Sequence, residues 1–364
     1  MALLDPDRLF PVEPKTRGVA RALYQTVADL PIISPHGHCD PSWFAANERF
    51  DNPAALFVTP DHYVFRMLIS QGVNPDALGI PRADGRAVEE DPRVIWRLFA
   101  SHFHLFRATP SAMWLNHAFE HVFGLNEPLN ALSADAHFDR IESALSHPDF
   151  LPRALFEQFG IEALATTESA LDDLRHHETI RDSGWTGRVI TTYRPDAVVD
   201  PEFEGFTTNL VELGELTGED TTSWAGYLAA HRVRRAQFKA AGATASDHGH
   251  PTARTEDLPA SEAETLFAKV VSGDCSPEEA DVFRGQMLTE MARMSLDDGL
   301  VLQIHAGSRR NHSASFFASH GRDMGFDIPG RTDFVEALKP LLNAVGLEPS
   351  LTIILFTLDE TTYG

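Results

Sequence analysis

The chain has little cysteine, no long apolar run and no excess of positive charge. Only two cysteines, Cys39 and Cys275, occur among 364 residues, which is too few for a disulfide framework or a thiolate zinc site. No stretch approaches the ~18 apolar residues that a membrane span needs, and the N-terminal residues lack the basic and apolar regions of a signal peptide. We therefore expect a cytoplasmic protein that does not contact membranes.

Several common catalytic signatures are also absent. The sequence has no Gly-x-x-x-x-Gly-Lys-Ser/Thr phosphate loop, no Gly-x-Gly-x-x-Gly after a strand, no Gly-x-Ser-x-Gly elbow and no His-Glu-x-x-His. Acidic residues outnumber basic ones 53 to 30, and the formal charge of −23 repels nucleic acid and anionic surfaces. An anionic substrate would need particular arginines that overcome this repulsion locally.

Short apolar runs of strand length alternate with longer helical stretches. This alternation is typical of βα units and a parallel sheet, and the 43% apolar content is sufficient for a large core. Six candidate strands share this pattern: residues 30–34, 161–166, 188–192, 242–246, 300–305 and 351–358. The pattern predicts a parallel α/β sheet, and the length allows either two average domains or one large (β/α) barrel with an insertion.

Several helix boundaries can be placed from capping signals. Ser261 and Ser276 each stand three residues before a glutamate, the pattern of a capping box, and proline follows Ser276 at the first helical position. Apolar residues recur at helical spacing over 287–296, and Gly299 follows where a helix can end. We expect two capping boxes and one helix that ends directly before a strand.

Residues from about 40 to 155 interrupt the alternation. They contain aromatic-rich helical patterns, such as 111–123 stopped by Gly124, and no convincing strand. We therefore expect residues 1–40 and 156–364 to form the barrel and residues 41–155 to form a helical insertion after the first strand. The polar stretch 246–260 is expected to be a loop, and loops after strands carry the chemistry of barrel enzymes.

Three His-x-His pairs are candidates for a metal site, because side chains two residues apart on an extended segment point the same way. His102 and His104 lie in an aromatic stretch, where packing explains them. His248 and His250 follow the strand predicted at 242–246, so a solvated turn and a functional loop are both open. His36 and His38 follow the first strand with a glycine between them, which lets the backbone approach an ion.

Polar residues also cluster at helix and strand ends. His62 and Arg66 lie four apart on a predicted helix, and Tyr63 stands between them; a surface helix with an acidic first turn is the alternative. Thr166-Thr-Glu168, Tyr193-Arg194-Pro-Asp196 and the segment from His305 to Asn311 each follow a predicted strand. Such polar strand ends are expected on the catalytic face of a barrel, although turn-forming residues also occur there.

In order along the chain, these segments resemble uronate isomerase, a family of the amidohydrolase superfamily of metal-using (β/α)₈ barrels. The resemblance covers essentially the whole chain. It rests on the following segments: Ser34-Pro-His-Gly-His38, Asp61-His-Tyr63, Thr166-Thr-Glu168, Arg194-Pro-Asp196, Ser246-Asp-His-Gly249, Leu302-Gln-Ile-His-Ala-Gly307, Arg310-Asn311, Gly325-Phe-Asp327 and Phe356-Thr-Leu-Asp359.

The resemblance implies reversible interconversion of D-glucuronate with D-fructuronate and of D-galacturonate with D-tagaturonate. A proton would move between C2 and C1 of the sugar. The implied roles are metal ligation, substrate binding and catalysis. They fall to His36 and His38 as metal ligands, to Arg194, Arg310, Asp247 and His248 as substrate-binding residues, and to His62, Tyr63 and His305 as catalytic residues.

The chain departs from the family pattern after the sixth predicted strand. The family continues to a Gly-x-x-Trp-Trp-Phe segment and an Asp-Ser-Arg segment, which would supply an acidic metal ligand. We expect six of the eight barrel strands here, a truncated barrel and open sheet edges. The cofactor is expected to be a divalent metal, with zinc favoured and manganese left open. The oligomeric state is not specified, and a homo-oligomer is allowed.

Two alternatives remain open from the sequence. A metal-dependent hydrolase on the same barrel would use similar first-strand histidines to activate water. A catalytically incomplete barrel that binds or supports other molecules is the second alternative, because the last strands are absent. Conversion of glucuronate to its ketose would distinguish the isomerase from the hydrolase, and metal analysis would distinguish both from the incomplete barrel.

Overall fold

The computed structural model describes residues 3–363. Its contacts divide the chain into two compact units, and each is described here by itself. The first unit contains the described residues up to Ile32, residues 47–161 and residues 311–327. The second contains residues 33–46, residues 162–310 and the described residues from Ile328 onward.

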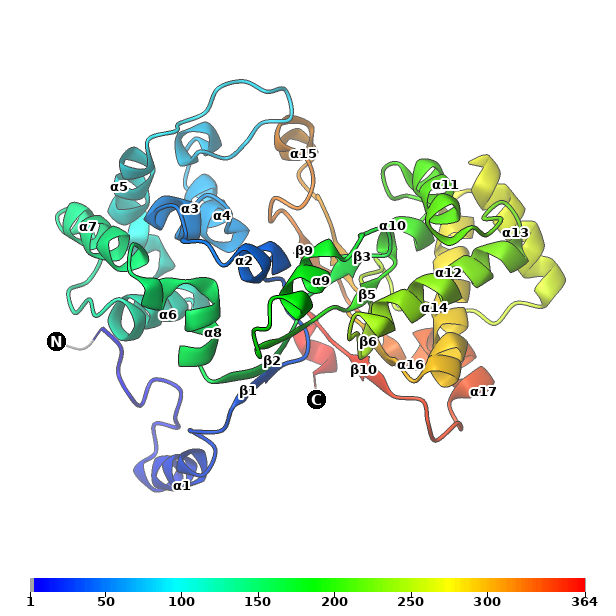
Figure 1. Cartoon of the computed structure of the whole chain (residues 1–364), viewed down its shortest axis with the longest axis horizontal. Coiled ribbons are helices and arrows are strands. Elements are labelled where there is room, and N and C mark those ends of the chain that lie inside the picture. Colours follow the sequence, from blue (N-terminus) through cyan, green and yellow to red (C-terminus); the bar gives the residue numbers. More distant parts are fainter. Residues whose placement is uncertain (1–2, 364) are drawn as a thin grey trace. The chain divides into compact units, whose positions relative to one another are not determined.

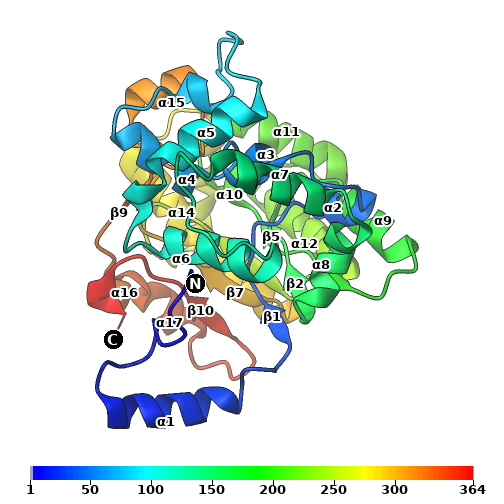
Figure 2. The same ribbon diagram turned by 90° about the vertical axis from the view of Figure 1, so that its left-hand side faces the viewer.

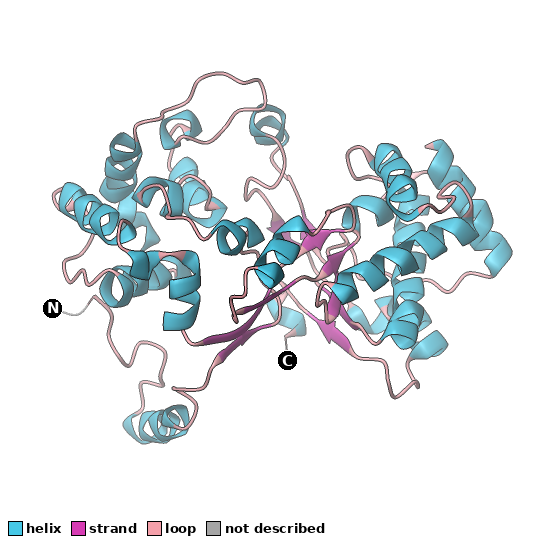
Figure 3. Ribbon diagram, in the orientation of Figure 1, coloured by secondary structure: helices cyan, strands magenta, loops and turns pink. Residues whose placement is uncertain are grey.

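The second unit is built on parallel strands. Strands β1, β2 and β4 form one sheet in that order, and β10, β7, β6, β5 and β3 form another. Only two residues separate β2 from β3 and β4 from β5, so the chain passes from one sheet directly into the other (Figure 3). The strand bounds are β1 (Ile32–Ser34), β2 (Ile161–Ala165), β3 (Glu168–Ser169), β4 (Arg188–Ile190), β5 (Tyr193–Arg194), β6 (Ala245–His248), β7 (Val301–Ile304) and β10 (Ile353–Leu355).

The register of these strands determines which residues meet at their carboxyl ends. Strand β6 pairs with β7 in parallel, and His248 stands beside Ile304. Strand β5 pairs with β6 through Tyr193 and Ser246, also in parallel. The residues that follow β5 and β7 therefore emerge next to the end of β6. The parallel arrangement that was expected is confirmed, while the barrel with six of its eight strands in this chain stays a prediction.

One predicted strand lies at a different position. The strand expected at 242–246 is observed at Ala245–His248, because Gly242 adopts a left-handed φ of 104° and belongs to the turn before the strand. Asp247 and His248 consequently lie inside β6 and are buried, whereas a loop was expected there. The loop begins only at Gly249.

Helices and a small antiparallel pair complete the second unit. The helices are α2 (Pro41–Ala46), α9 (Arg175–Asp182), α10 (Asp196–Val199), α11 (Phe206–Thr217), α12 (Trp224–Ala240), α13 (Ala260–Ser272), α14 (Pro277–Asp298), α16 (Phe334–Ala337), α17 (Lys339–Val345) and the short 3-10 turn η5 (Glu360–Thr362). The pair is β8 (Ser308–Arg309) and β9 (Ile328–Pro329). One apolar core runs from the strands into α11, α12, α13 and α14.

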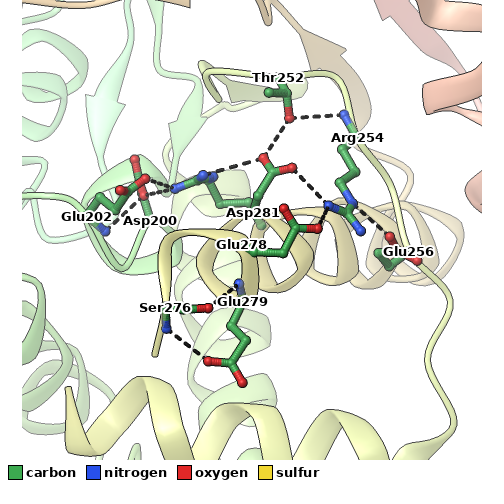
Figure 4. Close-up of polar contacts among 10 residues, drawn as sticks. Asp200, Glu202, Thr252, Arg254, Glu256, Ser276, Glu278, Glu279 and Asp281 are labelled. Carbon is green, nitrogen blue, oxygen red and sulfur yellow. Dashed lines mark hydrogen bonds and ion pairs between the residues drawn. The ribbon is translucent and has the colours of Figure 1, made fainter. Parts of the chain in front are cut away.

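Helix α14 holds two loops that follow sheet strands (Figure 4). Its capping box is present as predicted: Ser276 Oγ accepts from the Glu279 amide at 3.2 Å. One turn later, Asp281 accepts from Thr252 at 2.8 Å and from Arg254 at 3.2 Å. These bonds fix the loop that follows β6. The same helix reaches the segment after α10, because Arg284 donates to Asp200 at 2.7 Å and to Glu202 at 2.8 Å.

The capping box predicted at Ser261 is wrong. Helix α13 begins one residue earlier, at Ala260, and its N-cap is Pro259, which makes no side-chain cap bond. Ser261 therefore lies inside the first turn and cannot act as the cap. By contrast, α14 ends at Gly299 with a left-handed φ of 77°, as the sequence predicts.

The first unit is helical and has an aromatic core. Between Ser34 and Ile161 the described chain forms no strand. Trp96 is fully buried and donates to Ala134 O at 2.9 Å, and Phe99, Phe119 and Phe138 pack around its ring. Burying each of these side chains contributes roughly 1.5–3 kcal/mol relative to leaving it in water.

The elements of this unit are short helices. They are α1 (Pro14–Gln25), α3 (Pro53–Phe57), α4 (His62–Ser70), α5 (Pro92–His102), α6 (Pro110–His117), the π-helical turn η3 (Ala118–Val122), α7 (Ala134–Leu145), α8 (Pro152–Gln158), α15 (Ala314–His320) and the 3-10 turns η1 (Pro75–Leu78), η2 (Phe103–Phe106) and η4 (Pro148–Phe150). Helix α1 buries none of its residues, and Figures 1 and 2 show it apart from the others in this unit. Across residues 3–363, no helix is both long and apolar enough to cross a membrane.

Among residues 3–363, strands β1 and β10 each have a sheet neighbour on one side only. Their apolar side chains are correspondingly exposed, to 62% for Ile33 and 41% for Leu355. Such an edge presents unpaired backbone groups that another strand can bond. Both are therefore edge strands, whereas the truncated barrel expected from the sequence stays a prediction.

Candidate metal and sugar site

The candidate site lies at the carboxyl ends of the strands in the second unit. His36 and His38 follow β1, Arg194 ends β5, Asp247 lies in β6 and His305 directly follows β7. Parallel strands place their carboxyl ends along one edge of the sheet, so side chains from distant segments meet there. The loop after β1 is also tied to β7, because Gln303 donates to Pro35 O at 3.3 Å.

His36, Asp247 and His305 come together as a possible metal-binding group. One ligand atom from each lies within 4.8 Å of the other two. His36 Nε2 is 3.8 Å from Asp247 Oδ2, and His305 Nδ1 is 2.6 Å from Asp247 Oδ1. The sequence analysis expected the carboxylate ligand from a segment that follows the predicted strand 351–358. The carboxylate observed beside His36 is instead that of Asp247, which lies in β6.

Asp247 Oδ2 indicates what the group can bind. The Asp247 side chain is completely buried, and its Oδ2 accepts no hydrogen bond from any residue that the structure describes. Arg194 Nε lies 3.8 Å away, too far for a hydrogen bond. A buried carboxylate oxygen without a partner costs free energy, which a bound cation would offset. The donor set of imidazole nitrogen and carboxylate oxygen suits a divalent ion such as zinc.

His305 presents a defined tautomer to the site. A carboxylate only accepts, so the 2.6 Å contact with Asp247 places the proton of the neutral ring on Nδ1. The other nitrogen, Nε2, then carries the lone pair. It lies 3.3 Å from Arg194 Nη2, which donates to it. His305 is thus oriented by a carboxylate on one side and presents a basic nitrogen on the other.

His36 and His38 are both held in the neutral form. Desolvation lowers the pKa of His36 despite the opposing charge of Asp247. The pKa of His38 falls to about 4, mainly through desolvation and then through the charge of Arg194. Their ring centroids lie 5.2 Å apart. Neutral imidazole is the form that binds a metal, so both residues suit the predicted ligand role.

Arg194 is fixed by Asp196, a residue to which the sequence analysis assigned no role. Arg194 Nε donates to Asp196 Oδ2 at 2.9 Å, and the Gly249 amide donates to Asp196 Oδ1 at 3.0 Å. Burial alone would raise the pKa of Asp196, but the positive charge of Arg194 lowers it below its usual range. The Arg-Pro-Asp segment carried a usable signal, because Arg194 and Asp196 stand at the carboxyl end of a strand, where barrel enzymes place functional residues.

Gly249 lies where three of these side chains converge. A Cβ atom built on it would stand 2.7 Å from His305 Nε2, 2.8 Å from Asp196 Oδ2 and 2.9 Å from Arg194 Nη2. All three distances are shorter than real Cβ contacts. A larger residue would therefore have to displace the ends of these side chains, because the backbone of Gly249 approaches them closely.

His62 and Tyr63 lie in the first unit, at the start of α4. Asp61 caps this helix by accepting from the Tyr63 amide at 2.8 Å. The His62 and Tyr63 ring centroids are 4.4 Å apart, and burial lowers the pKa of His62. Gly325 packs against His62 so closely that a Cβ on Gly325 would lie 2.7 Å from His62 Cβ. The catalytic roles predicted for His62 and Tyr63 stay predictions.

His248 and Arg310 were both predicted to bind the substrate, but one is buried within a strand and the other is exposed. His248 is fully buried in β6, and its Nε2 lies 3.2 Å from Ser246 Oγ. A substrate contact by His248 would require an opening on that side of the strand. Arg310 is exposed and immediately precedes the segment that belongs to the first unit. Both substrate-binding roles stay predictions.

The comparisons with known proteins agree with one another. The family described as "Glucuronate isomerase" matches residues 14–363. "Uronate isomerase" of Mesorhizobium japonicum is 61% identical over 364 residues, which is 100% of this chain and 78% of the relative. The corresponding protein of Phenylobacterium zucineum is 61% identical, over 99% of this chain and 75% of its own.

Solved structures give the same result. The crystal structure of glucuronate isomerase from Caulobacter crescentus superposes with a TM-score of 0.96 at 59% identity, covering 99% of this chain and 75% of that one. Uronate isomerase from Thermotoga maritima superposes with a TM-score of 0.89 at 25% identity, covering 98% of this chain and 76% of that one.

Proposed function

Because this chain belongs to the glucuronate isomerase family, we infer that it is an enzyme that interconverts the aldose and ketose forms of uronate sugars. The reactions are D-glucuronate with D-fructuronate and D-galacturonate with D-tagaturonate. The observation that supports this site for them is the buried, unpartnered Asp247 Oδ2 between His36 and Arg194. The hydrolase alternative is not favoured, because relatives at 58–61% identity are uronate isomerases.

The residues present fit a divalent metal ion, which we take to be zinc. His36, His38 and Asp247 would hold it, as two neutral imidazoles and one carboxylate. His305 would orient Asp247 through its Nδ1–H. When bound, such an ion supplies Lewis-acid polarisation of the sugar oxygens at C1 and C2. Asp247 thus moves from the predicted substrate-binding group to the proposed ligands.

Arg194 is proposed to bind the sugar carboxylate. A guanidinium has five N–H donors in a planar fork, so Arg194 can hold Asp196 and a carboxylate at the same time. Asp196 fixes the plane of the fork before substrate arrives. The local positive charge would also offset the net charge of −23 that otherwise repels an anionic sugar.

His305 is proposed to move the proton between C2 and C1. In the aldose-to-ketose direction a base takes the proton from C2, the enediolate forms, and a proton arrives at C1 while the O2 hydroxyl proton is transferred to O1. His305 Nε2 carries a lone pair, and Asp247 stabilises the imidazolium that forms. Catalytic roles for His62 and Tyr63 are also part of the proposal.

The wider setting is also part of the proposal. A (β/α)₈-type barrel of the amidohydrolase superfamily, with six of its eight strands in this chain and residues 41–155 as its helical insertion, agrees with the parallel strands and with the similarity to the Caulobacter crescentus structure. A cytoplasmic location agrees with the reduced cysteines that the composition favours.

Kinetics of Arg194 variants would test the proposal. We expect zinc-loaded protein to convert D-glucuronate to a ketose, followed by ¹H NMR. Arg194→Met should raise KM by about 100-fold, because a charge-assisted bidentate contact worth on the order of 3 kcal/mol is lost. Arg194→Lys is the matched control and should retain part of the affinity. An unchanged KM in Arg194→Met would refute the carboxylate contact, and no ketose from the wild type would refute the activity.

A further inference from the structure

Thr167 links the end of β2 to the loop that carries His36 and His38. Its Oγ1 lies 3.2 Å from Gly37 O and 3.0 Å from His38 Nδ1. Both partners belong to the segment after β1, about 130 residues earlier in the chain. Nothing in the sequence assigns Thr167 a role of its own.

Only one placement of the protons on the Thr167 hydroxyl and His38 Nδ1 makes both contacts of Thr167 hydrogen bonds. A hydroxyl has one proton and two lone pairs, and a carbonyl oxygen can only accept. Thr167 must therefore donate to Gly37 O. It then has only lone pairs to offer His38, so His38 Nδ1 must carry the proton. The lone pair of the neutral imidazole is consequently on Nε2.

The surroundings hold Thr167 in the required position. Thr167 lies in the two-residue link between β2 and β3, and hydrogen bonds anchor the residues on either side of it: Thr166 Oγ1 donates to Glu168 Oε2 at 2.9 Å, and Thr191 also donates to Glu168. The backbone is fixed as well, since the Thr166 amide donates to Ile190 O at 2.8 Å. A β-branched side chain between two anchored residues has little rotamer freedom.

The partner loop is equally constrained at Gly37. A Cβ on this residue would lie 3.0 Å from Ala165 O, so the loop passes close to the end of β2. This close approach brings the Gly37 carbonyl and the His38 ring within reach of one hydroxyl. A glycine between the two histidines thus permits the contact as well as the approach of an ion.

We propose that Thr167 is a positioning residue that fixes His38 as the Nδ1–H tautomer, so that its Nε2 faces the divalent ion. The proposal deepens the function proposed above, because it rests on His38 as a metal ligand. Second-shell partners of this kind orient ligating histidines and typically change metal affinity by 10- to 100-fold. The partner of a ligating histidine is usually a carboxylate or a backbone carbonyl. Here the partner is the Thr167 hydroxyl, which accepts from His38 because its own proton is donated to Gly37 O.

Metal titration of matched variants provides the first test. Thr167→Val keeps the shape and removes the hydroxyl, while Thr167→Ser keeps the hydroxyl. We expect the Zn²⁺ dissociation constant, measured by competition with a chromogenic chelator, to rise about tenfold in Thr167→Val and to stay near the wild-type value in Thr167→Ser. Thr265→Val is the control for the substitution itself, because Thr265 is exposed and bonds only Ser261 O in its own helix.

Long-range ¹H–¹⁵N NMR of the metal-free protein provides the second test, independent of any metal. The cross-peak pattern of His38, assigned with His38→Gln, should show Nδ1–H in the wild type and in Thr167→Ser. In Thr167→Val the pattern should become a mixture of tautomers. A wild-type His38 with the proton on Nε2 would overturn the proposal, as would equal Zn²⁺ affinity in Thr167→Val. Wild-type protein that binds no Zn²⁺ would instead overturn the proposed metal site.

Discussion

Replacing Gly249 by alanine would place a methyl group against three polar side chains at once. The new Cβ would stand 2.7 Å from His305 Nε2, 2.8 Å from Asp196 Oδ2 and 2.9 Å from Arg194 Nη2. Ordinary carbon contacts need about 3.5 Å or more, so each side chain would have to move by about 0.6–0.8 Å. Overpacking of this kind costs roughly 1–3 kcal/mol of folding stability.

The substitution should also lower catalysis. A misplacement of about 1 Å at a catalytic group can reduce the rate by about 100-fold, so we expect kcat/KM for glucuronate to fall by that order in Gly249→Ala. The melting temperature should fall by only about 1–4 °C, because the entropy of unfolding of 364 residues is roughly 0.8 kcal/mol/K. Gly18→Ala is the matched control, because nothing lies within 4 Å of a Cβ at Gly18. Wild-type kcat/KM in Gly249→Ala would refute the convergence of these groups on the active site.

Three further perturbations follow from the structure. Asp196→Asn should raise KM by about tenfold with a smaller change in kcat, because Arg194 loses the charge that fixes it; steady-state kinetics would show this, and an unchanged KM would count against it. Gly325→Ala should lower kcat by about tenfold with an unchanged zinc content, since its Cβ would collide with His62; equal kcat would remove His62 from the mechanism. Burial raises the pKa of Glu168 from 4.5 to about 7, so the folded state holds this proton more tightly and stability falls as pH rises from about 4.5 to 7. The difference in free energy of unfolding between Glu168→Gln and wild type should therefore shift in favour of the variant by about 2–3 kcal/mol as the pH rises from 5 to 8. Denaturant melts at several pH values would measure this, and a difference that does not change with pH would contradict it.

The sequence predicted which strand ends meet, since this depends only on the parallel arrangement of βα units. His36, Arg194 and His305 could be assigned to one face because a polar residue interrupts each apolar run at its end. The position of Asp247 was harder to predict. A short alanine- and threonine-rich strand gives a weak pattern, and the left-handed Gly242 shifted the strand so that Asp247 is buried in it.

Contacts between distant segments could not be predicted from pattern alone. Thr167 contacts His38 because of the register between β2 and the segment that includes β1 and its loop. The spacing of apolar residues within each segment does not determine this register. That Asp247 Oδ2 is buried without a hydrogen-bond donor could not be predicted either, because it depends on where all the surrounding side chains lie. Capping signals were reliable at one helix and not at another. Ser276 caps α14 as predicted, whereas α13 begins at Ala260 with Pro259 as its N-cap, so Ser261 lies inside the helix.

The measurement that most directly tests the proposed site is the zinc content of wild-type and Asp247→Asn protein after equilibrium dialysis against buffered Zn²⁺. The wild type should bind one ion per chain. Asp247→Asn keeps the size of the side chain but loses the carboxylate charge that holds the ion, so its affinity should fall by at least about 100-fold. One ion per chain bound with equal affinity in Asp247→Asn would contradict the proposed metal centre at β1 and β6.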